Sequence, residues 1–135
     1  MKYLLDTNIC IYILNNKYRS ILDRIENEGI EKIALSTMTI AELALGVEKS
    51  QKKDKNKIAL MEFLLPFSIL DFNQNDAYSY AKIRADLEKK GNIIGNMDLL
   101  IGSQALSRGL CLVTNNEKEF ERIERIEIEN WITKI

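Results

Sequence analysis

Short apolar runs that alternate with segments of helical periodicity are the feature that most constrains the fold of this sequence. The apolar runs are residues 2–5, 32–36, 67–71 and 110–113, with a last strand expected at 125–131. The segments with helical spacing are residues 9–14, 17–28, 37–49, 58–65, 74–90 and 97–108. Strands that are apolar on both faces and alternate with helices are typical of a parallel sheet covered on both sides. We therefore expect an α/β fold, a three-layer α/β/α sandwich with a central, mostly parallel sheet.

The length and the composition limit the number of domains and the kinds of catalytic site that the chain can have. A chain of 135 residues is expected to form one domain, residues 1–135. Lys and Arg number 19 against 20 Asp and Glu, so the net charge is −1 and no global positive field attracts nucleic acid. The sequence contains no histidine, which excludes imidazole bases, Ser-His and Cys-His nucleophile pairs and His-ligated zinc. Any catalysis must therefore use carboxylates.

The cysteines and the apolar segments indicate the cellular compartment of the protein. Cys10 and Cys111 each lie within an apolar run, as buried free thiols do. The N-terminal apolar run meets Asp6 too early for a signal peptide, and no apolar stretch is long enough to span a membrane. We expect a cytoplasmic protein with no membrane association.

Polar residues follow each of the first four predicted strands. They are Asp6 and Asn8, Ser36 and Thr37, Asp71 and Asn73, and Thr114 with Asn115 and Asn116. Ligands of parallel α/β sheets bind outside the carboxyl ends of the strands. The sequence therefore predicts that the functional chemistry lies along one edge of the sheet.

Three acids near this edge are candidates for that chemistry, and each also has a structural explanation. Asp6 opens a helix and could serve only as its N-cap. Glu42 either completes a capping box with Thr39 or lies inside a helix that Ser36 or Thr37 caps earlier. Asp98 follows Asn96, a plausible cap, and an acid in the first turn interacts favourably with the helix dipole.

The three acids together are harder to explain structurally than each acid alone. Carboxylates that converge at one strand edge repel each other unless a divalent cation lies between them. Oxygen ligands without His or Cys select a hard cation, so the expected cofactor is Mg²⁺ or Mn²⁺.

Four blocks of the sequence carry polar residues among apolar ones in a fixed order. They are Leu4-Leu5-Asp6-Thr7-Asn8, Ser36 through Ala41-Glu42-Leu43 with Gly46, Asp98-Leu99-Leu100-Ile101 with Ala105 and Gly109, and Leu112-Val113-Thr114-Asn115-Asn116 with Glu119-Phe120. Together they resemble the PIN-domain ribonuclease toxins of the VapC type, in register from residue 1 to about residue 131.

The resemblance implies a Mg²⁺- or Mn²⁺-dependent endoribonuclease, the toxin of a type II toxin–antitoxin system that a small VapB-type antitoxin neutralises. It also suggests a homodimer. Asp6, Glu42 and Asp98 match the family's principal acids, and Asn8 and Thr114 match its polar accessory positions. The implied reaction is hydrolysis of RNA by metal-activated water, with Asp6 and Asp98 as metal ligands and Glu42 as a ligand or as the group that orients the water.

The sequence departs from the family pattern just beyond Thr114. Many members have an aspartate there, where this chain has Asn115 and Asn116, and Glu119 follows one helical turn later. Either Asn116 with a water or Glu119 would therefore fill the fourth acidic position.

Cationic side chains are candidates for contact with RNA phosphates. They are the lysines of residues 49–57 together with Lys82, Arg84, Lys89 and Arg108. We expect most of them on solvated helix faces, and Arg84, within the apolar stretch 81–87, is the RNA-binding candidate.

Two other classes of protein share part of this pattern. A phosphatase of the haloacid dehalogenase type needs a second aspartate two residues after the first, and that residue is Asn8 here. A catalytically inactive PIN-fold protein that binds RNA or acts as a scaffold remains the alternative, although intact Asp6, Glu42 and Asp98 argue against a decayed site.

Overall fold

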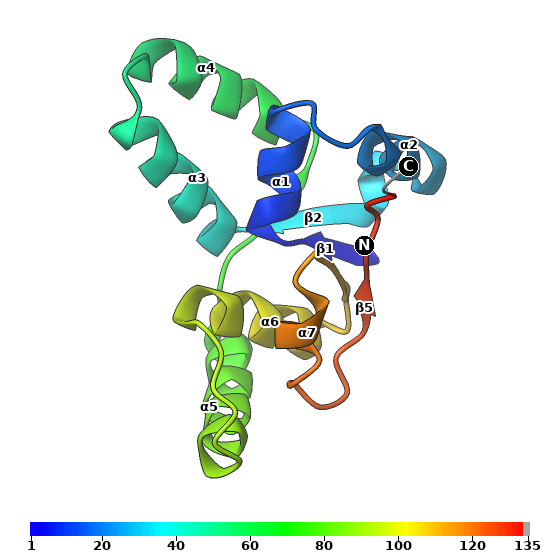
Figure 1. Ribbon diagram of the computed structural model, residues 1–135, viewed down its shortest axis with the longest axis vertical. Coiled ribbons are helices and arrows are strands. Elements are labelled where there is room, and N and C mark those ends of the chain that lie inside the picture. The colour runs from blue at the N-terminus through cyan, green and yellow to red at the C-terminus, as the bar shows by residue number, and fades with distance from the viewer. Residues whose placement is uncertain (134–135) are drawn as a thin grey trace.

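A computed structural model of the chain describes residues 1–133 (Figure 1). The strands are β1 (Tyr3–Leu5), β2 (Ile33–Ser36), β3 (Ser68–Leu70), β4 (Cys111–Val113) and β5 (Ile128–Glu129). The helices are α1 (Thr7–Leu14), α2 (Arg19–Glu28), α3 (Thr37–Lys49), α4 (Lys53–Leu64), α5 (Gln74–Lys89), α6 (Asn96–Arg108) and α7 (Glu117–Phe120), with a 3₁₀ turn at Ile30–Lys32. No helix within residues 1–133 is both long and apolar enough to cross a bilayer.

The five strands form one sheet in the order β3-β2-β1-β4-β5, and all four pairings are parallel. Helices α1 to α4 lie on one side of the sheet and α5, α6 and α7 on the other (Figure 1). The predicted α/β/α sandwich is thereby confirmed.

Alternate residues of the central strands supply two separate cores. Leu5 of β1 and Val113 of β4 pack with α1, α2, α3 and α4, whereas Leu4 and Leu112 face the opposite way and pack with α5, α6 and α7. Because both faces are covered, the central strands β1 and β4 are apolar at every position, as the sequence pattern indicated.

Three details of the prediction were wrong. Helix α4 begins at Lys53 instead of residue 58, because lysine favours helices and Asp54 suits the first turn. The last strand covers only Ile128–Glu129 of the expected 125–131. The N-cap of α6 is Gly95, which caps without a side chain, so Asn96 is the first helical residue and not the cap. Of the two alternatives for Glu42, the structure confirms the second: the hydroxyl of Ser36 caps α3, and Glu42 lies inside the helix without a Thr39–Glu42 capping box.

Candidate active site

The candidate site lies where the direction of the chain through the sheet reverses. From β1 the chain proceeds to β2 and β3 on one side, and then returns to β4 and β5 on the other. The carboxyl ends of β1 and β4 are therefore adjacent at a topological switch point, the usual location of ligands in such sheets. Asp6 follows β1, Thr114 follows β4, and the hydroxyl of Thr114 donates to Oδ2 of Asp6 at 2.8 Å.

Asp6 is both a helix cap and a member of the site. Its Oδ1 accepts from the backbone N–H of Thr7 at 2.8 Å, and its side chain is almost fully buried. Burial raises the pKa of Asp6, the negative charges of Glu42 and Glu119 raise it further, and the hydrogen bonds from Thr114 and Thr7 oppose this rise. The capping role and the candidate functional role therefore do not exclude each other.

Glu42 is held toward Asp6 by a residue of α1. The hydroxyl of Thr7 donates to Oε1 of Glu42 at 2.6 Å and lies 3.0 Å from the hydroxyl of Thr39. Since Ser36 caps α3, Glu42 lies in the second turn of that helix with its carboxylate free of any capping role.

Asp98 lies in the first turn of α6, half-buried among acids. Burial, followed by the charges of Asp6 and Glu119, raises its pKa from 3.8 to about 7, and Glu42 adds a smaller contribution. The neighbouring carboxylate of Glu119 therefore favours the protonated form of Asp98.

Glu119 is the fourth carboxylate of this cluster. Its Oε1 accepts from the backbone N–H of Gly95 at 3.1 Å, and its Oε2 accepts from the side-chain amide of Asn116. The hydrogen bonds from Gly95 and Asn116 lower the pKa of Glu119. Glu119 is therefore ionised in the pH range below about 7 in which Asp98 still carries its proton. The backbone N–H of Asn116 in turn donates to Thr114 at 3.0 Å, which ties α7 to the end of β4.

The remaining two predicted positions lie apart from these contacts. Asn8 lies exposed in the first turn of α1. Arg84 lies on α5, where its Nε donates to Glu88 at 2.9 Å and its guanidinium also donates to the hydroxyl of Tyr80 at 2.6 Å. Its hydrogen bonds within residues 1–133 are therefore to its own helix and not to the four carboxylates.

Sequence reasoning missed two residues that shape the site. Thr7 connects α1 to Glu42, and the backbone of Gly95 connects α6 to Glu119. The available signal for Thr7 was its place directly between Asp6 and Asn8 in the first block. No side-chain signal exists for Gly95, because only its N–H takes part.

The donor set suits a hard divalent cation, since every candidate ligand is an oxygen atom. The mutual repulsion that raises the pKa of Asp98 is the kind that a cation between carboxylates would relieve. Within the described chain, no three His, Cys, Asp or Glu side chains are gathered tightly enough to hold an ion as they stand. Binding would therefore require carboxylate rotations and loss of the Asp98 proton.

The chain is similar to known proteins over nearly its whole length. A family model described as PIN domain matches residues 3–126. Ribonuclease VapC2 of Rickettsia felis is 46% identical over 132 residues, covering 97% of this chain and 98% of the relative. The tRNA(fMet)-specific endonuclease VapC of Salmonella typhimurium is 40% identical over 131 residues, covering 97% and 98%. The crystal structure of DNA-bound VapBC from Salmonella typhimurium matches with a TM-score of 0.92 and 40% identity, covering 97% of this chain and 98% of that chain.

Proposed function

This chain belongs to the VapC ribonucleases of the PIN-domain family, the toxins of VapBC toxin–antitoxin systems, and from that premise we propose how its carboxylates cleave RNA. The proposed reaction is hydrolysis of a phosphodiester bond with Mg²⁺ or Mn²⁺ as cofactor. The observation that carries this proposal is the convergence of four carboxylates at the switch point, where burial and then the neighbouring negative charges raise the pKa of Asp98 to about 7.

Each side chain has a distinct proposed task. When bound, the cation would supply a water of lowered pKa and positive charge for the scissile phosphate. Asp6 and Asp98 would hold it, and Glu42 would hold it or orient the attacking water. Glu119, kept ionised by Gly95 and Asn116, would be the fourth acid. Thr7, Thr114 and Asn116 would fix the directions of these carboxylates, and exposed Asn8 would face the RNA.

The proposed substrate class is structured RNA, with transfer RNA as the first candidate. Support comes from the relative in Salmonella typhimurium, which is named for its specificity toward tRNA(fMet). Such a substrate would place the activity in the cytoplasm.

We further propose that a VapB-type antitoxin binds this chain. A groove of about 480 Å³ lies between α1, α3 and α4, with an apolar lining that includes Leu14, Leu43 and Leu60. Glu42 also lines it, so an apolar segment seated in the groove would lie beside the carboxylates. The VapBC assembly of Salmonella typhimurium is a precedent for such a complex. A homodimer, and one domain spanning residues 1–135, remain predictions; residues 134 and 135 lie outside the described part.

The alternative is a PIN-fold protein that binds RNA without cleaving it. All four carboxylates are present, and Asp6, Glu42 and Glu119 accept hydrogen bonds from neighbouring residues, which favours an active enzyme.

Cleavage of RNA by three variants tests the proposal. Asp6→Asn, Glu42→Gln and Asp98→Asn should each lower the cleavage rate by at least about 100-fold in Mg²⁺, because each removes a charge that the cofactor needs. Asp71→Asn is the matched control, since Asp71 is an exposed acid that follows β3 at the same edge of the sheet. Unimpaired cleavage by Asp98→Asn, with all variants folded by circular dichroism, would contradict the assignment.

A further inference from the structure

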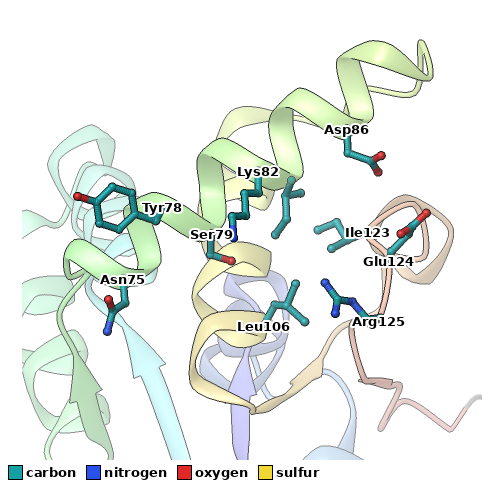
Figure 2. A pocket seen from close by; sticks show the side chains of 10 residues that line it. Asn75, Tyr78, Ser79, Lys82, Asp86, Leu106, Ile123, Glu124 and Arg125 are labelled. Carbon is teal, nitrogen blue, oxygen red and sulfur yellow. The ribbon is translucent and has the colours of Figure 1, made fainter.

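A hollow of about 600 Å³ lies between α5, the C-terminal half of α6 and residues 123–125 (Figure 2). None of the four carboxylates lines it. Lys82 of α5 and Arg125 lie on opposite walls, with their nitrogen atoms turned toward the space between them (Figure 2).

The two cationic side chains of this hollow form no ion pairs within residues 1–133. Within residues 1–133, neither Lys82 nor Arg125 has a carboxylate within ion-pair distance, whereas the two acids of the hollow are already paired. Lys90 lies 3.0 Å from Oδ2 of Asp86 and 2.6 Å from Oε1 of Glu124. Lys90 therefore offsets one of these two negative charges, and together with Lys82 and Arg125 the group carries a net positive charge that favours an anion.

The rest of the lining combines the polar side chains of Asn75 and Ser79 with apolar and aromatic ones. Ile123 is buried, Leu106 is half-buried, and Tyr78, which lies on α5 one helical turn before Lys82, is 61% exposed. An exposed ring beside cations is the combination on which single-stranded nucleic acids bind, with the base on the ring and the phosphate on the cations.

The backbone of Arg125 is also unusual. Its φ is 66°, in the left-handed region, where residues other than Gly, Asn and Asp are rare. A backbone conformation of this kind costs free energy and is typical of functional sites, so its presence at a residue that faces the hollow favours a ligand site there.

We propose that this hollow binds a nucleotide of the RNA substrate outside the cleavage site, with its phosphate between Lys82 and Arg125 and its base against Tyr78. The inference rests on the proposed ribonuclease function. Leu106 follows Asp98 by eight positions on α6, which is ~12 Å along the helix axis. That span corresponds to roughly four stacked nucleotides at ~3.4 Å each, so one strand can reach both sites.

Binding of a labelled 12-nucleotide RNA in EDTA, where no metal-dependent cleavage occurs, tests the hollow directly. Lys82→Gln and Arg125→Gln should each weaken binding several-fold and reduce the slope of log K against log salt by about 0.7, the value for one phosphate contact on a single strand. Tyr78→Ala should weaken binding without changing the slope, and Tyr78→Phe should bind as the wild type does. Lys32→Gln, which removes an exposed lysine of the 3₁₀ turn Ile30–Lys32 outside the hollow, is the control and should leave both quantities unchanged.

Cleavage kinetics in Mg²⁺ provide the second readout. Both charge variants should raise KM for a long RNA without changing kcat, and should leave cleavage of a tetranucleotide unchanged. If the wild type cleaves no RNA, the proposed function fails, while the binding measurement in EDTA still decides about the hollow.

Three results would overturn the proposal. The first is binding by Lys82→Gln and Arg125→Gln that equals the wild type. The second is a mononucleotide that binds as tightly as the RNA strand, which would make the hollow a site for small phosphate compounds. The third is a change of sedimentation mass in the variants, which would make it an interface between copies of this chain.

Discussion

The hydroxyl of Thr7 donates to Oε1 of Glu42 at 2.6 Å and thereby joins the first turn of α1 to the second turn of α3. Thr7 also follows Asp6 directly in the chain. The backbone N–H of Thr7 donates to Oδ1 of Asp6 at 2.8 Å. One residue therefore positions two of the proposed metal-binding carboxylates, one through its backbone and one through its side chain.

We expect Thr7→Val to impair catalysis while preserving the fold. Valine keeps the shape of threonine but cannot donate to Glu42, so the carboxylate loses its fixed direction. Loss of a group that orients a metal ligand costs about 10- to 100-fold in activity, and the lost hydrogen bond costs about 1 kcal/mol of stability. Cleavage rates and thermal melting measure the two effects. Thr7→Ser, which restores the hydroxyl, is the control, and equal rates in Thr7→Val and the wild type would contradict the positioning role.

The second prediction concerns the pH dependence of stability without metal. The pKa of Asp98 rises from 3.8 to about 7 on folding, so the folded state binds this proton more tightly than the unfolded state does. The contribution of Asp98 to stability should therefore be most favourable below pH 4, fall as the pH rises from about 4 to about 7, and level off above.

Urea unfolding in EDTA at pH 5 and pH 8 measures this effect as the difference between the wild type and Asp98→Asn. Asparagine cannot ionise, so the variant should gain stability relative to the wild type as the pH rises. Mg²⁺ at pH 8 should stabilise the wild type more than the variant, because only the wild type has the carboxylate. A difference between the two proteins that is the same at both pH values would show that Asp98 titrates normally.

The overall fold and most of the acid positions could be predicted from the sequence because both depend on local patterns. Apolar runs of strand length followed by polar residues place Asp6 and Thr114 at one edge of any parallel sheet. The link from Thr7 to Glu42 could not be predicted, because it depends on how α1 packs against α3, and threonine is unremarkable at a helix start. The start of α6 was misassigned because Asn96 is a good capping residue by type, whereas the observed cap, Gly95, acts only through its backbone.

The third prediction distinguishes the two candidates for the fourth acid. Glu119→Gln should weaken Mn²⁺ binding by about tenfold or more, since the pKa of Glu119 is lowered and its negative charge acts on Asp98. The same variant should lower the pKa of Asp98, because it removes one of the negative charges that raise it. Metal titration and the pH dependence of stability measure these two consequences.

Asn116→Asp is the comparison for that experiment. Its new carboxylate would repel Glu119, whose Oε2 now accepts from the Asn116 amide. It should therefore bind Mn²⁺ no more tightly than the wild type does. Tighter binding in Asn116→Asp together with unchanged binding in Glu119→Gln would assign the fourth position to residue 116.

The last prediction concerns the ends of the cleaved RNA. Ribonucleases that act without metal use an acid and a base, often histidines, so that the neighbouring 2′-hydroxyl attacks and a cyclic phosphate results. This sequence has no histidine for that role. Activated water should instead leave a 5′-phosphate and a 3′-hydroxyl on the products. Cleavage should stop in EDTA and resume when Mg²⁺ or Mn²⁺ is added. A 2′-O-methyl group at the cleaved nucleotide should be tolerated where it fits. End-group analysis measures the products, and a parallel preparation of Asp98→Asn reveals contaminating nucleases. A 2′,3′-cyclic phosphate formed in EDTA by the wild type but not by Asp98→Asn would overturn the hydrolytic mechanism, because it would require these carboxylates to activate the RNA hydroxyl without a metal.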